Sequence, residues 1–444
     1  MGAPRNPIRG FVWLPLVAAL LVLGATAHAG LIAHWKFDDT FTDSSPSGYN
    51  GTPSGSPTFS TDVPPVLAGG KSLFFNGSAQ SVAINTLGNS LTGSYTVATW
   101  AKVADLASLR EVISSRSPSD MGFDFKFQNG TMIHGDIGSG SAWMTTTADL
   151  NYAYSAGTWY HVAYTVRPTS YDIYLHNAAG ALVASRLAGT YGTPGTPLLF
   201  NPTHQLTIGR YSTEQFSGWL DDMTIYNAAL TVNQVHALAN GADPLHVQTA
   251  VRPIPGLFNT GVDASGVPLP NGPLVLDPHY SIILNPDGGG PGAHVEDETA
   301  FPLVAGPWLA NSSSSKWIAP RFNTVAAAGG VYEYELLFDL AGFSPATAYI
   351  TGRWATDNPG LDILINGIST GQTSGGFGSY TPFTISSGFV PGVNSLVFRL
   401  ENQGQGYTGL RVDSLAGTAY MPEPATLLLL GGGLCALARR RRRP

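Results

Sequence analysis

Short segments that alternate between apolar and polar side chains recur along this chain of 444 residues, and they constrain its fold more than any other feature. Side chains two residues apart point to the same face of a β-strand, so each segment is typical of a half-buried strand. The clearest examples are residues 31–37, 171–176, 331–338 and 396–400. With turn residues between them, these segments predict an all-β protein of antiparallel sandwiches.

One short helix interrupts this pattern. Thr231 is a good N-cap, Val232, Val235 and Leu238 share one face, and Gly241 ends the segment. The following stretch, residues 242–255, mixes proline and polar residues without strong periodicity, and we expect a linker there. The linker predicts two β-sandwich domains in tandem.

The N-terminus has the three parts of a secretory signal peptide. Arg5 and Arg9 supply positive charge, residues 11–26 are apolar, and small residues at positions 27 and 29 flank a histidine. We therefore expect signal peptidase to cut between Ala29 and Gly30. The chain after this cut is exported.

The C-terminus carries a second candidate targeting segment. Pro422, Glu423 and Pro424 precede an apolar run at residues 425–438, and five arginines follow at 439–443. Arginines resist transfer through hydrocarbon, so they stay on the cytoplasmic side and the rest of the chain lies outside. The run would form about 21 Å of helix against a hydrocarbon core of about 30 Å, which suits a transient transmembrane segment. A plain membrane anchor is the alternative, and a nucleic-acid-binding arginine tract fits less well after an apolar run.

This order of Pro-Glu-Pro, short apolar span and arginine cluster resembles the PEP-CTERM sorting signal of Gram-negative bacteria. The resemblance implies that an exosortase recognises the tail, cleaves near Pro422, Glu423 and Pro424, and releases the protein to the outer cell surface or the extracellular matrix. Retention of the tail as a plain membrane anchor is the alternative to cleavage.

Net charge and cysteine content limit the classes of binding partner and of chemistry that the exported body can have. Fifteen of the 22 basic residues and 28 of the 29 acidic residues lie between Gly30 and Met421, which gives this body a net charge of about −13. Such a body disfavours nucleic acid and favours a neutral or cationic polysaccharide. The one cysteine, Cys435, lies in the sorting tail, so the exported body has no disulfide and no thiol nucleophile.

The first domain resembles the laminin-G-like, concanavalin-type jelly roll of bacterial surface proteins. Such modules are mostly lectin-like or adhesive. The resemblance is carried by a set of segments in family order: residues 34–38, 43–51, 70–77, 95–100, 157–163, 206–209 and 216–227.

Asp221 is the candidate metal ligand of this domain. It shares strand parity with Met223 and Ile225, so we expect it on the apolar side, where an unpaired carboxylate is costly. Resembling domains often hold a structural Ca²⁺ between their first and last strands, which would make Asp38 and Asp221 ligands together with backbone carbonyls near Asn76. A carboxylate that accepts hydrogen bonds from a turn is the alternative.

An enzymatic role is not predicted. Jelly-roll glucanases resemble one another in a Glu-x-Asp-x-x-Glu strand that places two carboxylates on one face, and this spacing does not occur here. The adjacent acids Asp38 and Asp39, like Asp221 and Asp222, would point to opposite faces of a strand.

The second domain resembles the galactose-binding-like β-sandwich, on residues 352–358, 361–367 and 394–398. Folds of this kind bind sugars with an aromatic plane beside amide and carboxylate groups, which implies a carbohydrate site at Trp354, Asp357 and Asn358. Trp354 also alternates like a core residue, so a purely structural role stays open.

Together these features predict an exported, non-enzymatic surface or biofilm-matrix protein that binds polysaccharide. A matrix spacer without a small ligand is the alternative, and a glycan-active enzyme comes third. The predicted divisions are a signal peptide (1–29), a laminin-G-like domain (30–241), a linker (242–255), a galactose-binding-like domain (256–420) and the sorting signal (421–444).

Overall fold

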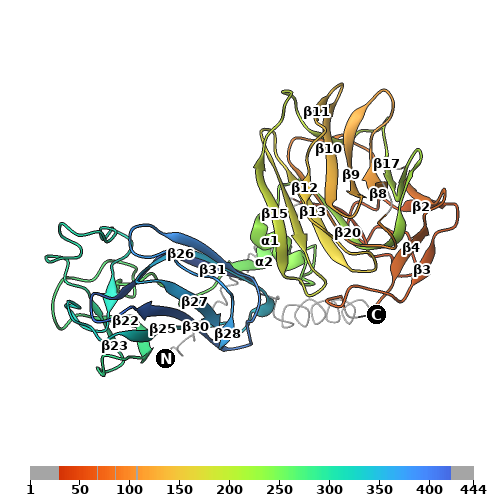
Figure 1. Ribbon diagram of the computed structural model, residues 1–444. Helices are drawn as coiled ribbons and strands as arrows, with labels where there is room; N and C mark the ends of the chain where they lie inside the picture. Colours follow the sequence, from red (N-terminus) through yellow and green to blue (C-terminus); the bar gives the residue numbers. More distant parts are fainter. Residues whose placement is uncertain (1–29, 68, 86, 107–108, 422–444) are drawn as a thin grey trace, which may run out of the picture.

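The computed structural model describes residues 30–67, 69–85, 87–106 and 109–421, which form two β-rich domains (Figure 1). The predicted cleavage residue Ala29, the motif Pro422, Glu423 and Pro424, and the predicted transmembrane segment lie outside these residues. None of the helices in the described ranges is long and apolar enough to cross a membrane.

The first domain is a sandwich of two eight-stranded antiparallel sheets. Sheet I contains, in spatial order, β15 (Leu182–Gly189), β14 (Tyr171–His176), β13 (Tyr160–Val166), β7 (Tyr95–Val103), β20 (Ser217–Tyr226), β4 (Ser72–Asn76) and β3 (Thr58–Ser60), with β1 (Leu31–Trp35) also paired to β20. Sheet II contains β11 (Trp143–Thr145), β10 (Met132–Gly140), β9 (Met121–Gln128), β8 (Leu109–Ser114), β17 (Leu206–Ile208), β5 (Ser81–Ile84) and β2 (Gly51–Ser54), with β12 (Leu150–Asn151) paired to β10.

Two small ribbons complete this domain. One pairs β6 (Leu91–Thr92) with β16 (Leu198–Phe200), and the other pairs β18 (Arg210–Tyr211) with β19 (Glu214–Gln215). The core between sheets I and II is apolar and rich in aromatic rings, such as Phe123 and Phe125 of β9 and Tyr164 of β13. Alternation along each strand therefore leaves every second side chain on the outer face of its sheet.

The second domain is one antiparallel sheet of eleven strands, called sheet III, which surrounds its own apolar core. Its spatial order is β28 (Ile368–Ser369), β27 (Gly360–Ile365), β30 (Val393–Asn402), β25 (Gly330–Asp339), β22 (Leu276–Leu284), β23 (Gly292–Val295), β24 (Ile318–Ala319), β31 (Gly409–Tyr420), β26 (Ser344–Asp357) and β29 (Thr381–Ile385), with β21 (Val251–Pro253) paired to β31. The predicted all-β class is confirmed.

Helices α1 (Val232–Leu238) and α2 (Val247–Ala250) lie between the two domains (Figure 1). The predicted cap is present: Thr231 accepts a hydrogen bond from the backbone of Gln234, whose side chain bonds back to Thr231. The apolar side of α1 packs on the outer face of sheet I, in a cluster that also includes Tyr420 of β31.

The predicted linker differs from the structure in one respect. Residues 242–255 hold α2 and β21, and Val247 and Ala250 are buried in the cluster between the domains. An irregular, exposed connection was expected because such a short helix and strand leave no periodic signal. The domain boundaries themselves remain a prediction.

Candidate functional site

A group of charged side chains occupies the outer face of sheet II. On β9 the three phenylalanines at 123, 125 and 127 point into the core, so Asp124 and Lys126 point outward. Cross-strand pairing sets Glu111 of β8 opposite Lys126, and Asp136 of β10 opposite Asp124. The β18–β19 ribbon adds Glu214 to the group.

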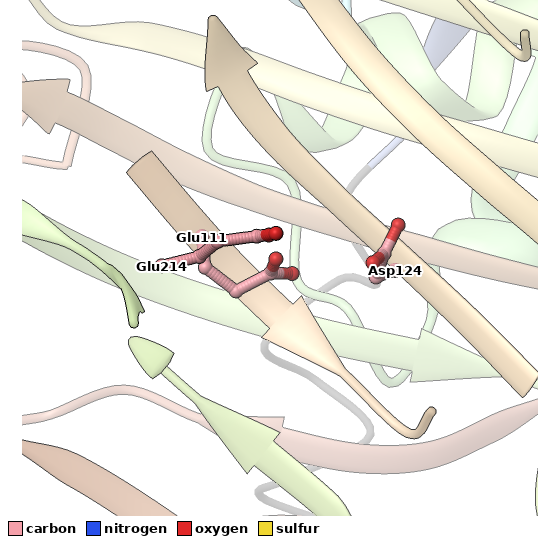
Figure 2. Close-up of side chains that lie close together, drawn as sticks. All are labelled: Glu111, Asp124 and Glu214. Carbon is pink, nitrogen blue, oxygen red and sulfur yellow. The ribbon is translucent and has the colours of Figure 1, made fainter. Parts of the chain in front are cut away.

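Glu111, Asp124 and Glu214 bring their carboxyl oxygens within 4.8 Å of one another (Figure 2). Two cations hold them. Arg116 Nε lies 2.7 Å from Asp124 Oδ2 and its Nη2 lies 2.5 Å from Glu214 Oε2. Lys126 Nζ lies 2.8 Å from the same oxygen of Glu214 and 3.1 Å from Asp124 Oδ2. We call these five residues the charged network.

Burial controls how the network titrates. Burial, followed by repulsion from Asp124, raises the pKa of Glu111 well above its usual range. Burial and then Asp136 raise the pKa of Asp124 to about 7, although Lys126 and Arg116 oppose this. Burial also acts on Glu214, but hydrogen bonds from Glu111 and Lys126 outweigh it and lower the pKa of Glu214. Glu111 thus keeps its proton.

This chemistry fits neither a glycosidase nor an open cation site. Glycosidase carboxyls stand about 5–9.5 Å apart with substrate between them, whereas Glu111 and Asp124 have no exposed surface. The oxygens of Asp124 and Glu214 that a divalent ion would take are already bound to Lys126 and Arg116. The charged network therefore stabilises the face as a closed, largely neutralised unit.

The outer face of sheet I carries a different group. Cross-strand pairs place Asp221 of β20 beside Trp100 of β7, Trp100 beside His161 of β13, and His161 beside His176 of β14. All four side chains are buried. We call this line the neutral row, because burial lowers the pKa of His161 to about 4 and that of His176 well below its usual range.

Helix α1 continues the row toward the second domain. The rings of His176 and His236 have centroids 5.4 Å apart, and His236 lies 5.5 Å from the ring of Tyr349 on β26. Burial lowers the pKa of His236 to about 4, partly opposed by a hydrogen bond with the backbone of Ala348. Among the described residues, His236 Nδ1 and both ring nitrogens of His176 lack a side-chain hydrogen bond that meets normal geometry.

The predicted orientation of Asp221 is wrong. A bulge between Asp221 and Thr224, where Asp222 has a φ of 48°, reverses the alternation, so Asp221 lies on the outer face while Met223 and Ile225 remain in the core. The expected burial is confirmed. Burial first, then Asp222 and Asp38, raise the pKa of Asp221 to about 9.

The predicted Ca²⁺ ligands lie close enough for Asp38 to affect Asp221, but they differ in setting. Asp38 is exposed, and its Oδ1 accepts a 2.6 Å hydrogen bond from the backbone of Lys71. Asn76 pairs with Ser217, four residues from Asp221 and so about 13 Å along the strand, which removes its carbonyl from the expected ligand set. Burial, and then repulsion from Asp222 and Asp38, raise the pKa of Asp221, and a cation beside it would favour the ionised carboxylate.

The carbohydrate site predicted at Trp354 is corrected by the structure. Trp354 has no exposed surface and packs on Phe398 in the core of the second domain, so it offers no face to a sugar. Asp357 is buried, accepts a hydrogen bond of 2.8 Å from Trp308 Nε1, and has its pKa raised to about 6 by burial. Asn358 uses its side-chain oxygen to bind the backbone of Gln403.

The charged network was not predicted from the sequence. Its local signal was the alternation of phenylalanine with Asp124 and Lys126, which places opposite charges two residues apart on one face. Arg116 and Glu214 are 98 residues apart, so only the tertiary fold brings them together.

Comparisons with known proteins agree with both main resemblances. Residues 76–236 match the concanavalin A-like lectin/glucanases superfamily. Residues 422–443 match the PEP-CTERM protein-sorting motif. The motif marks the chain as an exported, cell-surface-directed protein that exosortase processes. The likeness of the second domain to galactose-binding folds remains a prediction.

Several solved structures are similar at low identity. Domain 4 of the extracellular arabinanase AbnA from Geobacillus stearothermophilus, solved with arabinotriose, is 20% identical, with 47% of this chain and 98% of that chain covered and a TM-score of 0.35. The binding domain of botulinum neurotoxin DC, solved with rat synaptotagmin II, is 13% identical, with 90% and 96% covered and a TM-score of 0.35. The CBM40 domain of a Ruminococcus gnavus sialidase is 14% identical, with 33% and 83% covered and a TM-score of 0.25. No curated protein matches the sequence.

Proposed function

We propose that this protein binds polysaccharide without cleaving it, on the outer surface or in the biofilm matrix of a Gram-negative bacterium. The observation that carries the proposal is a lectin-like domain joined to a surface-sorting motif in one chain. Exosortase and signal peptidase process its ends, and the membrane holds it only transiently.

The closed charged network supports the non-enzymatic part. A glycan-cleaving site needs one carboxyl that donates a proton and a second that attacks or activates water, both in contact with substrate. Glu111 and Asp124 have perturbed pKa values, but both are fully buried and Asp124 is bound by Arg116 and Lys126.

The test uses the exported body, residues 30–421, which contains both cores. Affinity electrophoresis through gels that contain neutral, cationic or acidic polysaccharides should show retention in at least one gel. Incubation with the retained polymer should release no reducing ends. Retention in none of the gels would favour the spacer role, and released reducing ends would establish an enzyme.

We also propose a structural Ca²⁺ at Asp221 and Asp38. The support is the chemistry of Asp221, a buried carboxyl whose proton a cation would replace, next to a second carboxylate that already raises its pKa. Asp221 would bind the ion from sheet I and Asp38 from the loop after β1, so the ion would tie the first strand to β20.

Processing of the tail has its own test. Mass spectrometry of the protein from its native host should find most molecules without residues 439–443, because the tail after Pro424 is a sorting signal. Recovery of intact chains through Pro444 on most molecules would favour the plain membrane anchor.

A further inference from the structure

A polar cleft opens at the edge of the first domain, away from both groups described above. It has a volume of about 500 Å³. One wall is β11 and the segment after it, and the other wall is the segment that follows β15. Its lining includes Trp143, Thr145, Thr147, Arg186, Tyr191 and Thr193.

Hydrogen bonds fix the two walls to each other. The carbonyl of Met144 accepts bonds of 2.9 and 3.0 Å from the backbones of Gly192 and Thr193. Tyr191 donates its hydroxyl to the carbonyl of Arg167 at 2.7 Å and lies against the ring of Tyr171. A ligand therefore meets a cleft whose walls are already held in place, which lowers the entropy cost of binding.

Arg186 is the one charged side chain among the described residues that line the cleft. Its Nη1 donates to the carbonyls of Thr147 and Asp149, at 2.7 and 3.0 Å, and its guanidinium lies 5.2 Å from the ring centre of Tyr171. Nε and Nη2 make no hydrogen bond with the described part of the chain. Arg186 contacts Asp149 through its backbone carbonyl, and the carboxylate of Asp149 is bound to His134 at 2.6 Å.

The remaining lining suits a sugar ring. Trp143 is half-buried, so part of its side chain is open to solvent. Thr145 and Thr147 place their hydroxyls 3.3 Å apart, and Thr193 is exposed on the opposite wall. Pyranoses bind through an apolar ring face on an aromatic side chain and through hydroxyls that exchange hydrogen bonds with polar groups.

We propose that this cleft binds a uronic acid residue of an acidic polysaccharide. The sugar carboxylate pairs with the free edge of Arg186, its ring lies on Trp143, and its hydroxyls meet the threonines. This inference rests on the proposed polysaccharide binding and gives it a site and a sugar class. The net charge of the body favours neutral or cationic polymers, because an acidic protein repels an acidic polymer. Salt screens this repulsion beyond about 8 Å at physiological ionic strength. A carboxylate in direct contact with Arg186 is attracted at much shorter range.

The test compares two probes on the body of residues 30–421 by isothermal titration calorimetry. The probes are a galacturonic acid hexamer and the same hexamer with every carboxyl methyl-esterified. The wild type should bind the acid at least tenfold more tightly than the ester. Arg186→Gln should remove that preference, and Trp143→Ala should weaken both probes by about tenfold, the size of a lost aromatic contact.

Arg252→Gln is the matched control, because Arg252 is an exposed arginine of the second domain and its loss changes the net charge equally. It should leave both affinities unchanged. If Arg186→Gln lowers the melting temperature, Arg186→Lys and Trp143→Ala are titrated in its place. Lysine keeps the positive charge of Arg186 but lacks its paired hydrogen-bond donors.

Four outcomes would overturn the inference. If both probes bound equally and neither Arg186→Gln nor Trp143→Ala changed their affinity, the binding site would lie elsewhere. The proposed function would not be affected by that result. Equal losses in Arg186→Gln and Arg252→Gln would show a net-charge effect. A wild type that is retained by some other polysaccharide but ignores both hexamers would reject the sugar class, and a wild type that binds no polysaccharide would also reject the proposed function.

Discussion

The two outer faces of the first sandwich bury titratable groups in opposite ways. The charged network on sheet II pairs cations with carboxylates: Arg116 and Lys126 lie within about 3 Å of oxygens of Asp124 and Glu214. The neutral row on sheet I has no such partners and loses its charges to burial. The first face is covered by its own salt bridges, whereas the second is covered by α1 and the second domain.

This difference shows what a buried polar group requires. An ion can stay buried when opposite charges replace its water, and a group without them binds or releases a proton instead. The charged network should therefore respond to the loss of a partner, and the neutral row to pH and to metal ions. The predictions below separate these two behaviours.

The largest effect is expected in the charged network. Lys126→Met removes one of the two cations and leaves Arg116 alone to compensate the buried carboxyls, and breaking a buried ion pair in this way typically costs about 3–5 kcal/mol. The control is Lys71→Met, because Lys71 pairs with Asp39 at the surface, where a pair contributes about 0–1 kcal/mol. Urea denaturation of both variants measures the difference. Similar small losses would mean that Lys126 carries little of the network's stability.

The neutral row should respond to acid. The folded state lowers the pKa of His161 and His236 to about 4, below the 6.5 expected for an unfolded chain, so the unfolded state takes up protons first. Their contribution to stability is full above about pH 6.5 and falls as the pH drops toward 4, by at most about 3 kcal/mol for each histidine.

Variants isolate this contribution. The free energy of unfolding of the wild type should exceed that of His236→Phe at pH 7, and this difference should become smaller as the pH falls to 4. Denaturation at each pH measures it. His204→Phe is the control, because His204 is a half-buried histidine of the first domain that pairs with Asp120 outside the neutral row. A difference in unfolding free energy that stays constant down to pH 4 would show that His236 does not titrate as its burial implies.

Metal binding gives a third, slightly smaller effect. Without a cation, Asp221 stays protonated below about pH 9, so it contributes most at low pH and costs stability as the pH rises above its unfolded value. Asp221→Asn should therefore equal or exceed the wild type in chelator at pH 8. With Ca²⁺ at about one hundred times its dissociation constant, the wild type should gain about 2.7 kcal/mol and the variant nothing. Unchanged melting temperatures of the wild type in Ca²⁺ and in chelator would reject the ion.

The comparison also shows which parts the sequence could reveal. Segments such as residues 171–176 and 331–338 carry their own periodicity, so β14 and β25 and the all-β fold were predictable. The Thr231 cap was equally local. The face of Asp221 was not, because one extra residue at the bulge reverses the alternation and leaves no clear mark in the sequence.

The candidate sites depended still more on tertiary structure. Trp354 fitted both a core residue and a sugar platform, and only its packing against Phe398 decided between them. The charged network joins β8 and β9 to a ribbon nearly a hundred residues away. The cleft likewise joins the segment after β11 to the segment after β15, and no local pattern connects Trp143 with Arg186.

The smallest predicted effect concerns the cover of the neutral row. Thr231→Ala removes the capping hydrogen bond of α1 and should cost about 1 kcal/mol. Because α1 holds His236 against His176, fraying of its first turn should let water reach the row before the sandwich itself unfolds. Hydrogen exchange followed by mass spectrometry should show faster exchange in α1 and unchanged exchange in β9. Thr249→Ala is the control, because Thr249 is an exposed threonine of α2 whose hydroxyl donates to the carbonyl of His246. If β9 and α1 lost protection equally, the two faces would unfold as one unit, and the separate covers inferred for them would be wrong.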